Sequence, residues 1–161
     1  MNLEPAANIA LLVLDVDGVL TDGRLWFGPG GETLKVFHVR DGAGIKALQA
    51  AGVAVAIISG RRSDAVSSRA TELGVRYVYQ GIADKAAACQ QLLAELRLAP
   101  AQTACVVDDT PDLPLLALCG FSVAVADAHP AVRAAASHVT RAAGGAGAVR
   151  EVCDLLIAAR A

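Results

Sequence analysis

Residues 9–21 read Ile-Ala-Leu-Leu-Val-Leu-Asp-Val-Asp-Gly-Val-Leu-Thr, an apolar run that leads directly into two acids and a glycine. A run this short, closed by Asp and Gly, is typical of a strand that is buried on both faces of a parallel sheet. Because side chains alternate along a strand, Asp15 and Asp17 are expected to point to the same side. Gly18 allows the chain to turn tightly after them. The stretch predicts two carboxylates at the carboxyl end of a central strand, where open α/β sheets bind ligands.

Two interpretations of this acidic pair stay open on these residues alone. Carboxylates this close repel each other, and a bound divalent cation relieves that repulsion. An ordinary acidic loop after a strand explains a bare Asp-x-Asp about as well. The rest of the chain has to decide between a metal site and a loop.

The composition indicates one domain over residues 1–161 with an aliphatic core, since 55% of the residues are apolar and only 4% are aromatic. The net charge of -2, without a basic patch, argues against nucleic acid as a partner. No apolar run is long enough to span a membrane, and the first residues lack the basic region of a signal peptide. The four cysteines form no C-x-x-C pair, which favours buried free thiols in a reducing cytoplasm over a zinc site.

Strand-like and helix-like segments alternate along the chain, which predicts an α/β fold with a parallel sheet. Asp41 is expected to cap the helix that runs to about Ala51, and Ser63 the helix that runs to Leu73. Further strands are expected at 53–58, 75–79, 103–107, 121–126 and 138–140. Further helices are expected with Lys85 in the first turn and an end near Leu98, from Pro111 until Gly120 ends it, from Pro130, and at 147–160.

A β-hairpin is expected over about 24–39, because two strand-like runs flank a Gly-Pro-Gly-Gly turn at 28–31. It holds Trp26 and two of the three phenylalanines. An isolated hairpin is marginally stable in water, so this one has to pack on something. Its own domain and a partner subunit are both open as that surface.

Polar side chains recur where the predicted strands end. Asp15 and Asp17 follow the first strand, and Ser59 follows the second. The other members are Asp108 and Asp109 after a later strand, and Lys85 shortly after another. Since the carboxyl ends of parallel strands share one edge of the sheet, these groups can converge. Carboxylates suit Mg²⁺, and a hydroxyl with an ammonium suits phosphate oxygens, so the set predicts a magnesium-dependent phosphate-ester site.

The four motifs 15–19 (Asp-Val-Asp-Gly-Val), 59–61 (Ser-Gly-Arg), Lys85 and 108–109 (Asp-Asp) resemble those of the haloacid dehalogenase superfamily of phosphatases. The resemblance implies a Rossmann-like parallel sheet flanked by helices. Other segments resemble the capless branch that hydrolyses 3-deoxy-D-manno-octulosonate 8-phosphate for lipopolysaccharide synthesis. These are Thr21-Asp22-Gly23, the hairpin, and the segments at 37–42, 79–81, 124–130, 144–151 and 152–156. In that branch a protruding hairpin stands in place of a cap domain.

The resemblance also implies a separate role for each polar residue at the carboxyl ends of the strands. Asp15 would be the nucleophile that forms an aspartyl-phosphate, and Asp17 the general acid and base. Lys85 would neutralise Asp15 and, with Ser59 and Gly60, hold phosphate oxygens. Mg²⁺ would be bound by Asp15, Asp108 and the backbone carbonyl of Asp17. Asp109 and Asp112 would orient the waters of the metal.

Further expectations concern the substrate and the assembly. The resemblance favours Arg61 as a contact to the carboxylate of the sugar acid, with Arg40 in a similar role. It also implies a homotetramer built around the hairpins. The related 2-keto-3-deoxynononate 9-phosphate phosphatases carry an acid where this chain has Arg61, which favours the octulosonate. A departure is Val107, where the family usually has glycine before the acidic pair, so that metal affinity is in question.

Three rival functions remain. A phospho-accepting receiver module also has acids after its first strand, but it needs an acceptor Asp where this chain has Ser59. A catalytically silent subunit is disfavoured by the intact pair of Asp15 and Asp17. The same chemistry on another sugar phosphate, such as the nononate ester, stays open.

Overall fold

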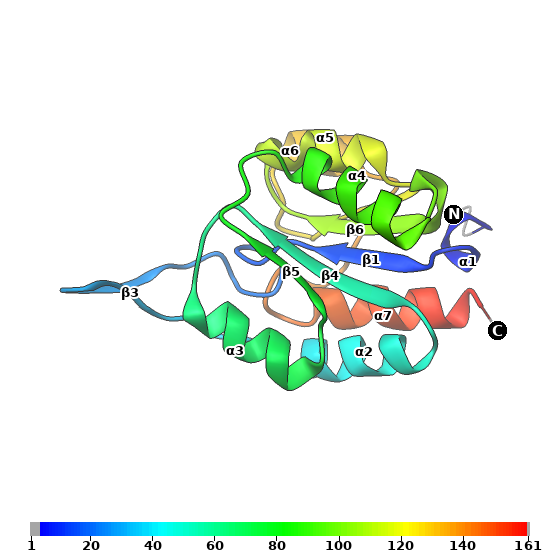
Figure 1. Ribbon diagram of the computed structural model, residues 1–161. Coiled ribbons are helices and arrows are strands. Elements are labelled where there is room, and N and C mark those ends of the chain that lie inside the picture. Colours follow the sequence, from blue (N-terminus) through cyan, green and yellow to red (C-terminus); the bar gives the residue numbers. More distant parts are fainter. Residues whose placement is uncertain (1–3, 161) are drawn as a thin grey trace.

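The computed structural model describes residues 4–160, and its centre is a six-stranded parallel sheet in the order β5-β4-β1-β6-β7-β8 (Figure 1). The strands are β1 (Leu11–Leu14), β4 (Ala54–Ser59), β5 (Tyr77–Gln80), β6 (Thr103–Val107), β7 (Phe121–Ala124) and β8 (His138–Val139). The predicted parallel α/β sheet is therefore confirmed.

Helices cover both faces of this sheet and complete a three-layered domain (Figure 1). One face carries α4 (Lys85–Leu96), α5 (Leu113–Leu118) and α6 (Pro130–Ala135). The other carries α2 (Val39–Ala50), α3 (Asp64–Leu73) and α7 (Ala148–Ala158). The shorter elements are α1 (Glu4–Ala7) and the 3₁₀ turns at Pro100–Gln102 and Thr110–Asp112.

Strand β1 lies at the middle of the core, and all four of its residues are fully buried. Each leucine buried in this way contributes about 1.5–3 kcal/mol to folding. On one side β1 pairs with β4, the next strand of this sheet along the chain, and on the other side with β6, which comes much later in the sequence. The strand order thus reverses at β1, and such a switch point places a ligand-binding crevice at the carboxyl ends of the strands.

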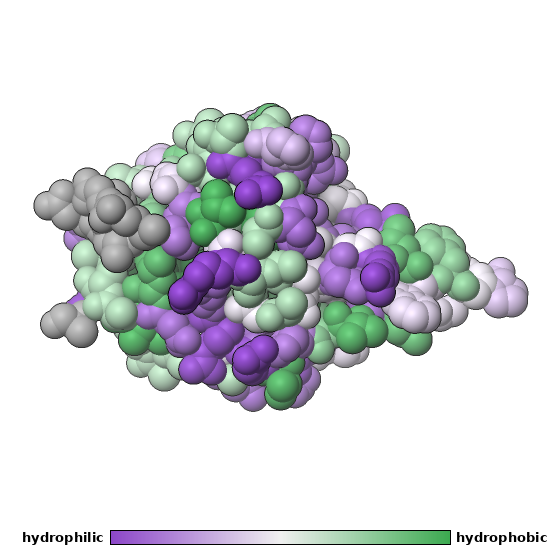
Figure 2. All heavy atoms as spheres, turned by 180° about the vertical axis from the view of Figure 1, so that it is seen from behind, coloured by the Kyte–Doolittle hydropathy of each residue, from purple (hydrophilic) through white to green (hydrophobic). Residues whose placement is uncertain are grey.

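The hairpin consists of β2 (Trp26–Gly28) and β3 (Gly31–Leu34), joined antiparallel, and it projects away from the sheet (Figure 1). Six large apolar side chains are exposed on the hairpin and the residues that flank it: Leu25, Trp26, Phe27, Leu34, Val36 and Val39. Figure 2 shows hydrophobic surface along this projection. The hairpin is confirmed, and most of its apolar surface is not covered by its own domain.

Several predicted helix ends need correction. Asp41 does not cap α2. The cap is His38, whose Nδ1 accepts a hydrogen bond from the amide of Arg40, while Asp41 lies inside the first turn and is buried. Ser63 does occupy the cap position of α3, but its side chain makes no capping hydrogen bond. Pro111 lies in the 3₁₀ turn that precedes α5 rather than in the α-helix itself. Within residues 4–160, no helix is long and apolar enough to cross a membrane.

Candidate active site

A cleft of about 460 Å³ lies at the carboxyl ends of β1, β4 and β6. The structure brings nearly all of the predicted site residues to it. Those lining the cleft are Asp15, Asp17, Ser59, Gly60, Arg61, Lys85, Asp108, Asp109 and Asp112. They come from segments up to about a hundred residues apart in the sequence, and the parallel sheet alone explains their meeting.

Lys85 joins two of the acids at the floor of this cleft. It is the first residue of α4, and Asp84 caps this helix by accepting a hydrogen bond from the amide of Ala87. The Nζ atom of Lys85 lies 2.9 Å from Asp15 Oδ1 and 2.7 Å from Asp112 Oδ1. Burial lowers the pKa of this ammonium, but the two carboxylates outweigh burial and raise the pKa above its ordinary value. Lys85 is therefore a permanent cation at this position.

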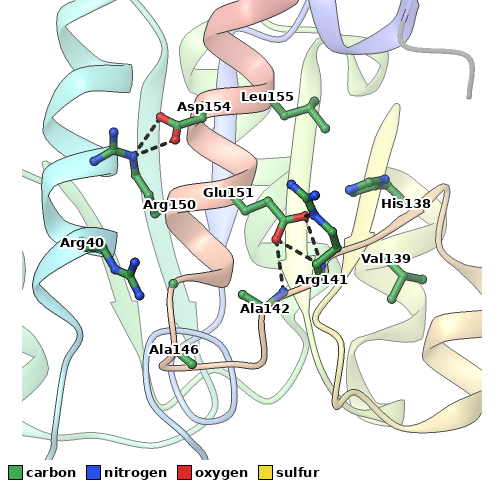
Figure 3. A pocket seen from close by; sticks show the side chains of 11 residues that line it. Arg40, His138, Val139, Arg141, Ala142, Ala146, Arg150, Glu151, Asp154 and Leu155 are labelled. Carbon is green, nitrogen blue, oxygen red and sulfur yellow. Dashed lines mark hydrogen bonds and ion pairs between the residues drawn. The ribbon is translucent and has the colours of Figure 1, made fainter.

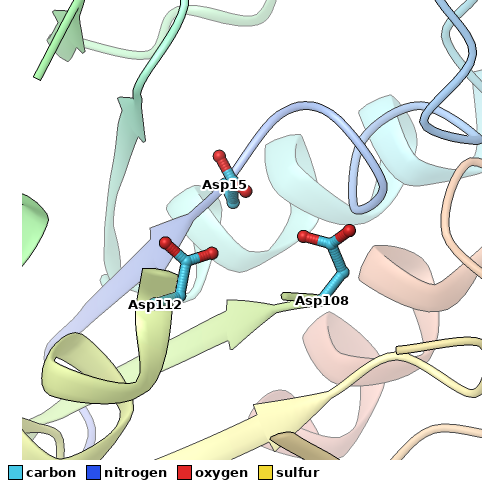
Figure 4. A group of neighbouring side chains, drawn as sticks. All are labelled: Asp15, Asp108 and Asp112. Atoms are coloured by element: carbon cyan, nitrogen blue, oxygen red, sulfur yellow. The ribbon is translucent and has the colours of Figure 1, made fainter. Parts of the chain in front are cut away.

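A third carboxylate, Asp108, lies close to the two acids that Lys85 contacts. Asp15, Asp108 and Asp112 point toward one another, with one oxygen of each within 4.8 Å of the others (Figure 4). Burial raises the pKa of Asp15 to about 6, against the opposing effect of Lys85 and with a further contribution from Asp112. Burial and repulsion from Asp15 and Asp112 raise the pKa of Asp108 to about 7. The cluster thus carries more negative charge than Lys85 can balance.

This donor set fits Mg²⁺. A hard divalent cation prefers carboxylate oxygens, and it relieves the repulsion that raises the two pKa values. Asp112 was predicted to lie outside the metal ligands, yet it is 2% exposed and shares the cluster with Asp15 and Asp108. Asp109, predicted for the same outer role, is exposed, and its carboxylate accepts a hydrogen bond from the amide of Thr110. The structure therefore separates two acids that the sequence grouped together.

The loop after β6, which carries Asp108, packs closely against the turn after β1. The amide of His129 donates a hydrogen bond to the carbonyl of Asp108 at 2.8 Å. Gly18 has a φ of 85°, and a Cβ there would come within 2.0 Å of Asp108 Oδ2. Gly144 lies against the other side of this turn, where a Cβ would meet the carbonyl oxygen of Gly18 at 1.8 Å. Only glycine fits either position.

Asp17 has a different environment from Asp15. Its Oδ1 lies 2.5 Å from Lys35 Nζ, and its Oδ2 lies 3.7 Å from Arg61 Nε. Glu32 binds both of these cations. Sequence reasoning did not find Lys35 or Glu32, because the pattern of a hairpin strand does not show which of its polar residues will pair with Asp17 or Arg61.

Arg40 does not line this cleft. It lines a separate cavity of about 790 Å³ beside the start of α7, together with Arg150 and Glu151 (Figure 3). The structure of a single chain therefore does not bring Arg40 to the acids. Val107 is the fully buried last residue of β6, where it continues the regular pairing with β7 opposite Ala124.

Comparison with known proteins agrees with this geometry. A family model of haloacid dehalogenase-like hydrolases matches residues 77–151. The 3-deoxy-D-manno-octulosonate 8-phosphate phosphatase of Yersinia pestis is 51% identical over 158 residues, which cover 98% of this chain and 84% of that protein. The chain belongs to this phosphatase family. The enzyme of Escherichia coli K12 is 52% identical over 155 residues, which cover 96% of this chain and 82% of the relative.

Solved structures of this family have the same fold. The crystal structure of the Yersinia pestis phosphatase matches with a TM-score of 0.96 and covers 98% of this chain and 85% of its own. A phosphatase from Moraxella catarrhalis, in complex with magnesium ion, phosphate ion and the sugar acid, matches with a TM-score of 0.95 at 39% identity, over 98% of this chain and 90% of its own. The cobalt-bound Haemophilus influenzae enzyme gives a TM-score of 0.95 at 44% identity, over 97% and 91%. As a member of this phosphatase family, the chain is a phosphoric monoester hydrolase.

Proposed function

We propose that this chain hydrolyses 3-deoxy-D-manno-octulosonate 8-phosphate to the free sugar acid and inorganic phosphate, a step in making lipopolysaccharide precursors. The observation that carries the proposal is the contact of Asp15 with Lys85 inside a cluster of carboxylates, in a chain about half identical to phosphatases of that name. A receiver module would need an acceptor aspartate where β4 ends in Ser59, and the intact pair of Asp15 and Asp17 argues against a silent subunit.

The reaction has two steps. A carboxylate oxygen of Asp15 attacks phosphorus, and the bond from phosphorus to the sugar oxygen breaks as Asp17 gives that oxygen a proton. This leaves an aspartyl-phosphate on Asp15. Water then attacks the phosphorus and loses a proton to Asp17, and the bond to Asp15 breaks to release inorganic phosphate. Lys85, at 2.9 Å from Asp15, lowers the repulsion between the nucleophile and the phosphate dianion.

Mg²⁺ would be held by Asp15, Asp108 and the backbone carbonyl of Asp17, and the position of Asp112 in the cluster favours it as a close neighbour of the ion. When bound, Mg²⁺ supplies positive charge that offsets the phosphate and aligns it for in-line attack. The raised pKa values of Asp15 and Asp108 show that the positive charge of the protein around these two carboxylates does not balance their burial and mutual repulsion.

The other side of the cleft suits the substrate. Ser59 is buried at the end of β4, and with Gly60 it lines the same cleft as the nucleophile Asp15. The side chain of Arg61 is about half exposed at the cleft although Glu32 holds one of its nitrogens at 3.1 Å, and its planar guanidinium suits the carboxylate of a sugar acid. We propose that Ser59 and Gly60 bind the phosphate and that Arg61 recognises the sugar acid.

Release of phosphate from a panel of sugar phosphates, with and without Mg²⁺, tests the proposal on the wild type and Asp15→Asn. We expect Mg²⁺-dependent release from the octulosonate ester, which the substitution abolishes. Arg61→Ala is expected to raise KM for this ester by about tenfold or more, but not for a phosphate ester without a carboxylate. Release from the nononate ester alone would be consistent with the proposed mechanism but would refute the proposed substrate.

We further propose that the protein acts in the cytoplasm as a homotetramer whose subunits meet at the hairpins. The exposed apolar side chains of the hairpin need a cover, and the four buried free cysteines suit a reducing compartment. Sedimentation at about micromolar concentration should give four chains. The variant Phe27→Asp, which charges the most exposed ring of the hairpin, should dissociate them, whereas a monomeric wild type would refute the tetramer.

A further inference from the structure

The base of the hairpin places one cation, Lys35, against Asp17 of the active-site cleft. Lys35 follows β3 directly, and its neighbours Leu34 and Val36 are both exposed. The side chain of Lys35 itself is only 2% exposed. Burying an ammonium is costly unless it is paired, and here its Nζ lies 2.5 Å from Asp17 Oδ1 and 3.1 Å from Glu32 Oε1.

This contact belongs to a closed set of four charges, and the set joins three separate segments of the chain. Glu32 accepts hydrogen bonds from Lys35 at 3.2 Å and from Arg61 at 3.1 Å. Arg61 in turn approaches the second oxygen of Asp17, with Nε at 3.7 Å from Oδ2. The acids and bases alternate, so each charge has an opposite charge on either side. The hairpin is thereby attached to the general acid.

The two oxygens of Asp17 are consequently not equivalent. Oδ1 is engaged by the nearly inaccessible Lys35. Oδ2 lies beyond hydrogen-bonding distance of Arg61, whose side chain is about half exposed and able to move away. The geometry leaves Oδ2 as the oxygen that can exchange a proton with the substrate.

We infer that Lys35 is a positioning residue for Asp17: by binding Oδ1 it fixes the carboxyl group so that Oδ2 carries the proton to and from the reacting oxygens. This inference rests on the proposed phosphatase reaction, in which Asp17 is the general acid and base. Lys35 itself touches neither the phosphate nor the nucleophile in this scheme. Its effect therefore has to appear in the proton-transfer step and to depend on Asp17.

The first experiment compares kcat and KM of the wild type, Lys35→Met and Lys35→Arg on the octulosonate ester. We expect Lys35→Met to lower kcat by about 100-fold with KM changed less than about threefold, since positioned proton transfer is worth roughly that much. Lys35→Arg should recover at least about tenfold of the loss, because a guanidinium also binds a carboxylate. Lys46→Met, an exposed lysine on α2, is the matched control and should keep wild-type kinetics.

The second experiment separates positioning from a general structural role. Pre-steady-state release of p-nitrophenolate from p-nitrophenyl phosphate reports attack by Asp15 with a leaving group that needs no proton. Lys35→Met should change the rate of this burst less than about threefold. In an Asp17→Asn background, Lys35→Met should change kcat on the sugar ester less than about threefold, because the two residues act as one unit. If Lys35→Met does not fold, Lys35→Gln takes its place in both measurements.

Three outcomes would overturn the inference. A raised KM with unchanged kcat would make Lys35 a substrate ligand. Equal losses on both esters would make it a structural anchor, and additive losses with Asp17→Asn would show that it does not act through Asp17. A wild type that hydrolyses neither ester would instead refute the proposed function.

Discussion

A carboxylate oxygen of Asp108 lies where a side chain on Gly18 would have to be, since a Cβ built there would come within 2.0 Å of Oδ2. The turn after β1 and the loop after β6 are therefore packed so closely that one residue without a side chain decides the place of an acid in the cluster. Gly18 also has a φ of 85°, which other residues adopt at a cost.

Gly18→Ala is expected to displace Asp108 and to reduce phosphatase activity by about 100-fold, because a metal ligand must be held to well within an ångström. Gly52→Ala is the matched control. Gly52 has a φ of 86°, and no atom lies within 4 Å of its would-be Cβ. Both variants should lose about 1 kcal/mol of stability by urea unfolding, but only Gly18→Ala should lose activity. Similar activity in both variants would contradict this prediction.

Lys85→Met is expected to destabilise the metal-free protein by about 3 kcal/mol, because Asp15 and Asp112 would then be buried without their cation. Added Mg²⁺ should restore part of this loss, since it supplies positive charge to the same carboxylates. Urea unfolding in chelator and in Mg²⁺ measures both effects. The exposed Lys46→Met should change stability by less than about 0.5 kcal/mol, and an equal loss in Lys85→Met and Lys46→Met would refute the argument.

Mg²⁺ affinity is expected to fall as the pH is lowered through about 7 and then 6, the raised pKa values of Asp108 and Asp15. Both pKa values are higher in the folded protein than in the unfolded chain. Without metal, the two carboxyls therefore contribute most to folding stability at low pH, and this contribution is lost as the pH rises through the folded-state values of about 6 to 7. Mg²⁺ competes with the same protons, so its stabilising effect must grow over that range.

Thermal unfolding with and without Mg²⁺, from about pH 5 to about pH 8, checks this dependence. The rise in Tm on adding Mg²⁺ should be small at the acid end and large at the alkaline end, with affinity changing by up to about tenfold per pH unit for each proton released. A Tm increment that is constant over the range would show that the two carboxyls are ionised throughout.

Asp112→Asn is expected to weaken Mg²⁺ binding by about 10- to 100-fold, because the carboxylate of Asp112 lies inside the cluster with Asp15 and Asp108. Asp109→Asn should have a much smaller effect of less than about threefold, since Asp109 is exposed and an amide oxygen can still accept the hydrogen bond from Thr110. Isothermal titration of both variants measures the difference. Equal losses would place the two acids in the same role and contradict the assignment.

The cleft itself was predictable from local signals. Apolar runs that end in acids or serine mark the strands, and parallel strands must bring those ends to one edge. Asp15, Asp17, Ser59, Lys85 and Asp108 therefore meet as the sequence predicted. The hairpin was equally visible, because its Gly-Pro turn lies between two strand-like runs.

The remaining details depended on how distant segments pack. The short spacing between Asp109 and Asp112 could not show that a 3₁₀ turn buries one and exposes the other. Asp41 resembled a helix cap, but its carboxylate instead accepts a hydrogen bond from the amide of Arg150, more than a hundred residues later. A cap is a local choice, whereas this contact exists only because α2 and α7 pack together.

The sequence by itself thus determined the parallel sheet, the acidic edge and the chemistry that edge can support, because strand periodicity and turn residues are properties of neighbouring residues. Only the tertiary structure decided that Asp112 joins the carboxylate cluster, that Lys35 reaches Asp17 and that Arg40 lies in another cavity. These three outcomes depend on the direction in which a loop or hairpin leaves the sheet. That direction is set by contacts between segments far apart in the chain, which no local pattern encodes.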